Sequence, residues 1–286
     1  MSSSPKRRPK GSFKLFPKGG RKNLQRVSEG RGAISEVKRR RGIYLLPNAF
    51  TTAALFCGFY AIVMAMDQNF TQSAGAIFIA MVLDSLDGRV ARLTNTQSEF
   101  GAQYDSLSDM ISFGAAPALV VYEWSLRGLD KLGWIAAFIY CAGAALRLAR
   151  FNTNITVVDK RYFQGLPSPA AAALVAGFIL LMSELHFVGA ELRWAAWVIT
   201  LLAGLTMVTN VPFYSFKDVN LKKTVPFIGP LLILLLIVVV VSDPPKVLFG
   251  LFVLYALSGY AVLIWRLMKG RPVSIIQTEN EVQEGK

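Results

Sequence analysis

Four aspartates close together in the sequence are the side chains best suited to do chemistry. They are Asp84, Asp87, Asp105 and Asp109. The first two are three residues apart and the last two are four apart, so each pair lies on one face of a helix. The polar residues within Leu93–Phe100 predict a turn between the pairs. The sequence therefore predicts two antiparallel helices, each of which offers two carboxylates to the other.

The chemistry that this arrangement favours is the binding of a divalent cation. Converging carboxylates repel one another unless a cation lies between them, and Mg²⁺ or Mn²⁺ prefers oxygen ligands of this kind. Arg92, on the face of the first pair, adds a guanidinium that suits a phosphate group. The alternative is a set of interhelical salt bridges, but only Arg89 and Arg92 are available in this stretch for four acids. We therefore expect phosphoryl transfer at a metal site near a membrane surface.

The whole stretch reads Asp84-x2-Asp87-Gly-x2-Ala-Arg-x8-Gly-x3-Asp105-x3-Asp109. It resembles the signature of the CDP-alcohol phosphatidyltransferase family at every fixed position. The resemblance implies that Asp84, Asp87 and Asp105 hold a pair of divalent ions, Mg²⁺ or Mn²⁺. It also implies that Asp109 is the general base of the reaction and a further metal ligand.

The same resemblance implies a fold and a set of partners. The fold would be a six-helix membrane core, and the chain would form a homodimer. The donor would be CDP-diacylglycerol, with its cytidine diphosphate part bound at Gly88, Arg92 and Gly101.

Composition independently indicates a membrane protein, because 53% of the 286 residues are hydrophobic. Cys57 and Cys141 fall in apolar runs and are interpreted as small buried side chains, and His186 is interpreted as a loop residue. The predicted fold class is an all-α polytopic membrane protein with about eight transmembrane helices. We place these spans near residues 44–66, 72–92, 105–126, 133–151, 168–186, 192–212, 225–242 and 246–267.

Positive charge is distributed very unevenly along the chain. Residues 1–43 hold fourteen Lys and Arg and two Glu, a net charge of +12. Three interpretations of this tail stay open: attraction to anionic lipid head groups, a solvated segment that only fixes orientation, and nucleic-acid binding, which no motif supports. With the N-terminus inside, 27 of the 31 Lys and Arg fall on the inner side, which predicts that both termini are cytoplasmic in a bacterial inner membrane.

These features predict four regions. Residues 1–43 form a mostly disordered basic tail with a short interfacial helix near 33–42. Residues 44–212 form the catalytic transmembrane core. Residues 213–267 add two transmembrane helices, and residues 268–286 form a cytoplasmic C-terminal tail.

The acceptor of the transferred group is indicated by weaker features. Arg147, Arg150 and Asn152 end the fourth predicted span on the cytoplasmic side. The arginines either extend to lipid head groups or bind an acceptor carboxylate or a donor phosphate. Pro117 predicts a kink in the third span, and residues 165–169 predict a turn followed by a helix start.

Together with residues 46–48 and 55–58, these stretches resemble the bacterial phosphatidylserine synthases within the family, over about residues 43 to 175. The resemblance implies transfer to L-serine with release of CMP. Another acceptor, such as glycerol 3-phosphate, an inositol phosphate, choline or a second phosphatidyl group, stays open because the arginines suit several of these. A cation transporter that uses the aspartates as its ion site is a further alternative, although no repeat of broken helices is evident.

Overall fold

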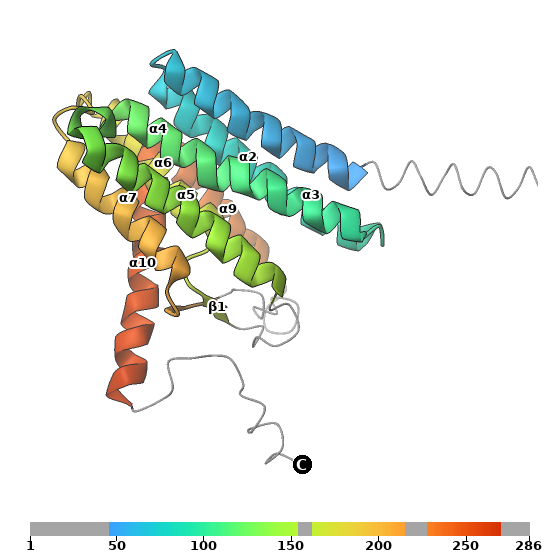
Figure 1. Ribbon diagram of the computed structural model, residues 1–286. Coiled ribbons are helices and arrows are strands. Elements are labelled where there is room, and N and C mark those ends of the chain that lie inside the picture. Colours follow the sequence, from blue (N-terminus) through green and yellow to red (C-terminus); the bar gives the residue numbers. More distant parts are fainter. Residues whose placement is uncertain (1–45, 154–161, 215–227, 270–286) are drawn as a thin grey trace, which may run out of the picture. The chain divides into compact units, whose positions relative to one another are not determined.

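A computed structural model of the chain describes residues 46–153, 162–214 and 228–269, which are almost entirely helical (Figure 1). The predicted tail at 1–43, its interfacial helix at 33–42 and nearly all of the tail at 268–286 lie outside these residues. The helices, in chain order, are Leu46–Met66, α2 (Phe70–Leu93), α3 (Glu99–Asp109), the π-helix η1 (Met110–Ala115), α4 (Ala116–Trp124), the 3-10 helix η2 (Leu126–Leu129), α5 (Asp130–Thr153), α6 (Ser168–Glu184), α7 (Arg193–Val208), α9 (Ile228–Ser242) and α10 (Pro244–Met268).

Each of the eight predicted spans overlaps a helical segment of the described chain, so the all-α prediction is confirmed. The third segment consists of α3, η1 and α4 in succession, and the fourth of η2 and α5. Three segments are long and apolar enough to cross a membrane, namely Leu46–Met66, Leu126–Thr153 and Pro244–Met268, while α6 and α7 are shorter apolar helices. The sequence did not predict one short antiparallel pair of strands, β1 (Tyr162–Gln164) and β2 (Pro212–Tyr214).

The third segment is irregular next to the last aspartate of the motif. The π-helix η1 begins directly after Asp109, and Pro117 lies in the first turn of α4. Proline has no N–H to donate and its ring crowds the preceding turn, and the wider turn of a π-helix provides space there. The kink predicted at Pro117 thus corresponds to a π-helical turn that starts one residue after Asp109.

Polar side chains of the third segment are paired with the first helix. Ser108 donates a hydrogen bond to the carbonyl of Thr51 and Ser112 donates one to the carbonyl of Ala54, both at 3.1 Å. Both serines are buried. The first helix therefore covers this polar face of the third segment, because both hydroxyls have protein partners there.

The helix α5 is held firmly between α7 and η1. A Cβ added to Gly143 would lie 2.5 Å from the carbonyl oxygen of Gly204, so only glycine permits this approach of α5 to α7. On its other side, the fully buried Tyr140 donates a hydrogen bond of 3.1 Å to the carbonyl of Phe113 in η1. This packing fixes the position of the following turns of α5, which carry Arg147 and Arg150.

Candidate metal centre and donor pocket

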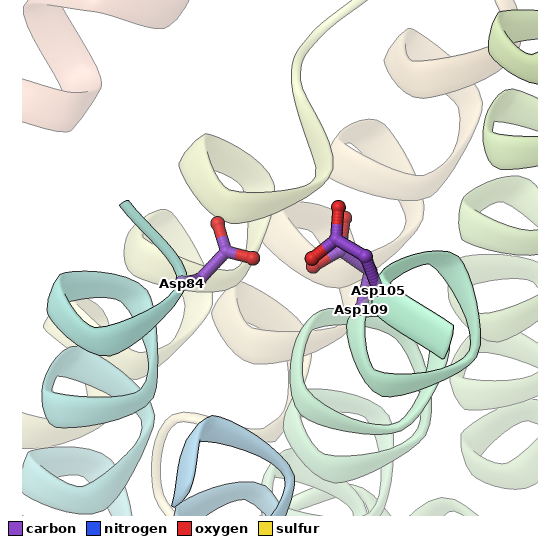
Figure 2. Close-up of side chains that lie close together, drawn as sticks. All are labelled: Asp84, Asp105 and Asp109. Atoms are coloured by element: carbon purple, nitrogen blue, oxygen red, sulfur yellow. The ribbon is translucent and has the colours of Figure 1, made fainter. Parts of the chain in front are cut away.

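Three carboxylates from two helices come together at one point. Asp84 of α2 and Asp105 and Asp109 of α3 have carboxylate oxygens within 4.8 Å of one another, and Figure 2 shows them pointing into a shared space. The turn between the helices makes this possible: Asn95 adopts a left-handed conformation (φ 51°), and the Ser98 side chain caps α3 by accepting a hydrogen bond from the backbone N–H of Gly101. The predicted pair of facing helices is therefore present.

The fourth aspartate, Asp87, is not one of these three. Its side chain is 5% exposed and accepts a hydrogen bond of 2.7 Å from the Thr51 hydroxyl of the first helix. It also lies within hydrogen-bonding reach of Asp105. The four carboxylates are therefore contiguous, but Asp87 is anchored from outside the two-helix motif.

The residues present fit a divalent cation. The Oδ1 atom of Asp105 is buried and has no hydrogen-bond partner among the described residues, which is costly for a carboxylate oxygen unless a cation is bound. Within the described residues, ion pairs form between Arg127 and Glu123 and between Lys246 and Asp243, away from the carboxylate cluster. Salt bridges to arginine therefore do not account for the carboxylate cluster, whereas a hard cation that takes oxygen ligands would.

A pocket of about 290 Å³ opens beside the cluster. It contains all three residues that the family resemblance assigned to the cytidine diphosphate part of the donor, together with two aspartates. Its lining comprises Pro47, Asn48, Thr51, Asp87, Gly88, Ala91, Arg92, Thr96, Gln97, Ser98, Gly101, Ala102 and Asp105. The pocket is therefore built by the first helix, α2, α3 and the turn between them.

The three predicted acceptor residues lie on the α5 side of the cluster. Arg147 donates a hydrogen bond of 2.5 Å to the hydroxyl of Ser168 and interacts electrostatically with Asp109. Asn152 donates one of 3.0 Å to the hydroxyl of Ser106 on α3. Arg150 instead donates to the side chain of Asn210 at 3.1 Å. Of the three, Arg147 is the one whose charge acts on a carboxylate of the cluster.

Comparison with known proteins decides the family. The family model described as CDP-alcohol phosphatidyltransferase matches residues 44–206, which include the cluster, the pocket and Arg147. The chain belongs to the CDP-alcohol phosphatidyltransferase family. With its apolar helices, this membership makes the chain an integral membrane protein.

Several relatives within the CDP-alcohol phosphatidyltransferase family carry one name, CDP-diacylglycerol–serine O-phosphatidyltransferase. A protein of that name from Helicobacter pylori is 36% identical over 228 residues, which are 79% of this chain and 95% of the relative. One from Methanocaldococcus jannaschii is 34% identical over 62% of this chain and 78% of the relative. One from Mycobacterium tuberculosis is 36% identical over 53% of this chain and 55% of the relative.

Two contacts of this phosphatidyltransferase site were missed by sequence reasoning. Thr51 and Ser168 are hydroxyl residues far from the aspartate motif in the chain, and their types alone do not distinguish them from other polar residues in apolar helices. Thr51 follows Pro47 by one helical turn, and its hydroxyl also bonds the Pro47 carbonyl at 3.1 Å. The four-residue spacing from Pro47 was the signal available for Thr51, because it places the Thr51 hydroxyl beside the carbonyl of a proline at the start of the first helix.

Thr51 supplies the first testable prediction. In Thr51→Val the side chain keeps its shape and loses the hydroxyl that orients Asp87, so we expect the Mn²⁺ concentration for half-maximal activity to rise about tenfold. Thr52→Val is the matched control, since the Thr52 hydroxyl pairs with Tyr104 and with the carbonyl of Asn48. An unchanged metal requirement in Thr51→Val would show that the contact does not orient Asp87.

Proposed function

We propose that this phosphatidyltransferase moves the phosphatidyl group of CDP-diacylglycerol to the hydroxyl of L-serine, giving phosphatidylserine and CMP. The observation that carries the proposal is the name of the relatives, above all the Helicobacter pylori protein, of which this chain covers 95%. The carboxylate cluster, with the pocket on one side and Arg147 on the other, supports a donor and an acceptor that meet at the cluster.

The pocket beside α2 and α3 is the proposed donor site. Arg92 at its mouth is exposed and presents a guanidinium to a diphosphate. A Cβ added to Gly88 would meet only the Arg92 side chain, at 4.0 Å, so the protein's own packing does not require glycine at that position. Close approach of the donor would explain it. Gly101 lines the same pocket.

Asp84, Asp87, Asp105 and Asp109 would hold the divalent ions, Mg²⁺ or Mn²⁺ and two in number. When bound, such ions polarise the donor's diphosphate and stabilise the departing CMP. The protein's own part is to keep the carboxylates in place, through Thr51 on Asp87 and through the capped turn before α3.

Asp109 is the proposed general base. It takes the proton from the serine hydroxyl while the hydroxyl oxygen forms a bond to the phosphorus that carries diacylglycerol. The bond between that phosphorus and the oxygen bridging to CMP breaks, and CMP leaves with its electron pair. Asp109 suits this role because it belongs to the carboxylate cluster and is influenced by the charge of Arg147.

Arg147 is the proposed partner of the serine carboxylate. Its guanidinium contacts Ser168, the first residue of α6, so it lies at the positive end of that helix dipole. The Arg147 guanidinium and this helix end are two positive features on the α5 side of the cluster, and a carboxylate fits a guanidinium well. Arg150 and Asn152 lie on the same cytoplasmic end of α5, and we propose that they help to bind the acceptor.

An acceptor panel tests the proposal. Purified protein is supplied with CDP-diacylglycerol and, in turn, serine, glycerol 3-phosphate, inositol phosphate and choline, each with and without a chelator. We expect CMP release with serine only, and none after chelation. CMP release only with another acceptor would overturn serine as the substrate, and ion flux without CMP release would favour transport.

Substitution of Arg147 is expected to affect the acceptor selectively. In Arg147→Lys the charge stays but the planar fork is lost, so we expect the KM for serine to rise at least about tenfold with the KM for CDP-diacylglycerol unchanged. Arg193→Lys is the matched control, because Arg193 bonds the carbonyl of Ala190 at the start of α7. A rise in the donor KM instead would assign Arg147 to a donor phosphate.

The proposal includes the arrangement in the membrane. We propose that residues 44–212 are the catalytic core, that residues 213–267 add two transmembrane helices and that the chain acts as a homodimer in a bacterial inner membrane. The excess of Lys and Arg in 1–43 supports cytoplasmic termini. The cluster then faces the cytoplasm, where serine is available and CMP can leave.

A further inference from the structure

The turn that follows Asp109 departs from α-helical geometry. In the π-helix η1 hydrogen bonds span five residues, and the N–H of Ala116 bonds to the carbonyl of Ile111. Such a turn holds one residue more than an α-helical turn. It therefore rotates α3 by about 100° relative to α4, compared with a continuous α-helix. The direction of the Asp109 carboxylate relative to the helices around α4 thus depends on η1.

The Phe113 carbonyl within η1 receives a hydrogen bond from another helix. In an α-helix this carbonyl would accept the N–H of the fourth residue after it, but that residue is Pro117, which has no N–H. The Tyr140 hydroxyl of α5 donates to the carbonyl at 3.1 Å. Both Phe113 and Tyr140 are fully buried, so a neighbouring helix and not water supplies this donor. Tyr140 therefore stabilises the π-turn at a carbonyl that proline leaves without its usual partner.

The first helix holds the same turn through a second contact. A Cβ added to Gly58 would lie 2.7 Å from the Cα of Ser112, so glycine is needed for this approach of the first helix to η1. The buried Ser112 hydroxyl donates to the Ala54 carbonyl, one helical turn before Gly58. The π-turn is therefore fixed from two helices, the first helix and α5.

The helix α5 is attached to the third segment on both sides of Asp109. The Tyr140 hydroxyl bonds to Phe113, four residues after Asp109, and the Asn152 amide bonds to Ser106, three residues before it. Because the α5 number rises where the other falls, the two segments run antiparallel, as Figure 1 shows for α5 beside α3 and α4. Loss of the first attachment would leave α3 free to turn about its axis and would redirect the Asp109 carboxylate.

We propose that Tyr140 is a positioning residue for the general base: its hydrogen bond to the Phe113 carbonyl keeps the π-turn that directs the Asp109 carboxylate into the cluster. The inference rests on the proposed function, because it takes Asp109 as the base. It also gives Pro117 a role in the reaction, since the missing N–H of Pro117 leaves the carbonyl available to Tyr140.

The test is Tyr140→Phe, which keeps the ring and removes only the hydroxyl. We expect kcat to fall about tenfold, because Asp109 is less often placed to accept the proton. The KM values for serine and CDP-diacylglycerol and the affinity for Mn²⁺ should change less than about twofold, because their binding groups are retained.

Ser125→Ala is the matched control for the loss of a buried hydroxyl. Ser125 follows α4, at the end of the third segment away from Asp109, and its hydroxyl also donates to a backbone carbonyl, that of Gly189, at 2.6 Å. We expect this variant to keep the wild-type kcat.

A double-mutant cycle distinguishes positioning from general destabilisation. In an Asp109→Asn background, Tyr140→Phe should lower the residual kcat no further, because the base on which the hydroxyl acts is gone. Ser112→Ala tests the same turn through the first helix, with an expected fall in kcat of about threefold, and it decides the matter when Tyr140→Phe yields little folded protein.

Three results would overturn the inference: a wild-type kcat in the folded variants of the turn, equal rises in both KM values, or additive losses in the cycle. Failure of the proposed function is seen differently, as full kcat in Asp109→Asn alone.

Discussion

Replacing Asp109 with asparagine is expected to lower kcat about a thousandfold while Mn²⁺ and CDP-diacylglycerol still bind. The amide keeps the size of the side chain and one oxygen that can face a metal, but it cannot accept the proton of the serine hydroxyl. The measurement pairs CMP release under saturating substrates with Mn²⁺ and donor binding on the same preparation.

Asp130→Asn is the matched control for this substitution. Asp130 begins α5 at the end of the helix opposite Arg147, and asparagine keeps the size of its side chain. We expect it to retain wild-type turnover. Full activity in Asp109→Asn would remove Asp109 from the proton transfer, and loss of Mn²⁺ binding would make it chiefly a ligand.

Replacing Asp105 with asparagine is expected to weaken Mn²⁺ binding more than about a hundredfold and to lower turnover at subsaturating metal by a similar factor. Asp105 carries the buried oxygen without a hydrogen-bond partner among the described residues, and its carboxylate lies between those of Asp87 and Asp109. Loss of its charge removes the member of the cluster that contacts both the donor pocket and the base.

Asp105→Asn and Asp109→Asn therefore differ in a measurable way. A metal titration of turnover should shift to much higher Mn²⁺ in Asp105→Asn and should stay low at every Mn²⁺ concentration in Asp109→Asn. Identical titration curves for the two variants would mean that the cluster is not divided into a ligand and a base.

The spacing of the aspartates predicted that Asp84, Asp105 and Asp109 come together, because that spacing depends on local helix geometry. Steps of three and four residues place side chains on one helical face whatever the surroundings, and the short polar turn brings α2 and α3 to face each other across the donor pocket. Hydrophobic runs likewise predicted the eight helical segments of the described chain, since a helix in lipid must satisfy its own backbone.

Contacts between distant residues were beyond local reasoning. Asp87 differs from the other three aspartates because of Thr51, which is 36 positions away. Arg147 reaches the Ser168 hydroxyl, 21 positions away, only because α6 begins beside α5. No repeat or periodicity links these positions, so the pairing of hydroxyls with charged groups became visible only in three dimensions.

The most direct test of the carboxylate cluster as a metal centre is anomalous diffraction from crystals of the protein soaked with Mn²⁺. We predict anomalous density beside the carboxylates of Asp84, Asp105 and Asp109, and its loss in Asp105→Asn. Anomalous density only at other positions would contradict the account. So would its absence beside these carboxylates at Mn²⁺ concentrations that support turnover.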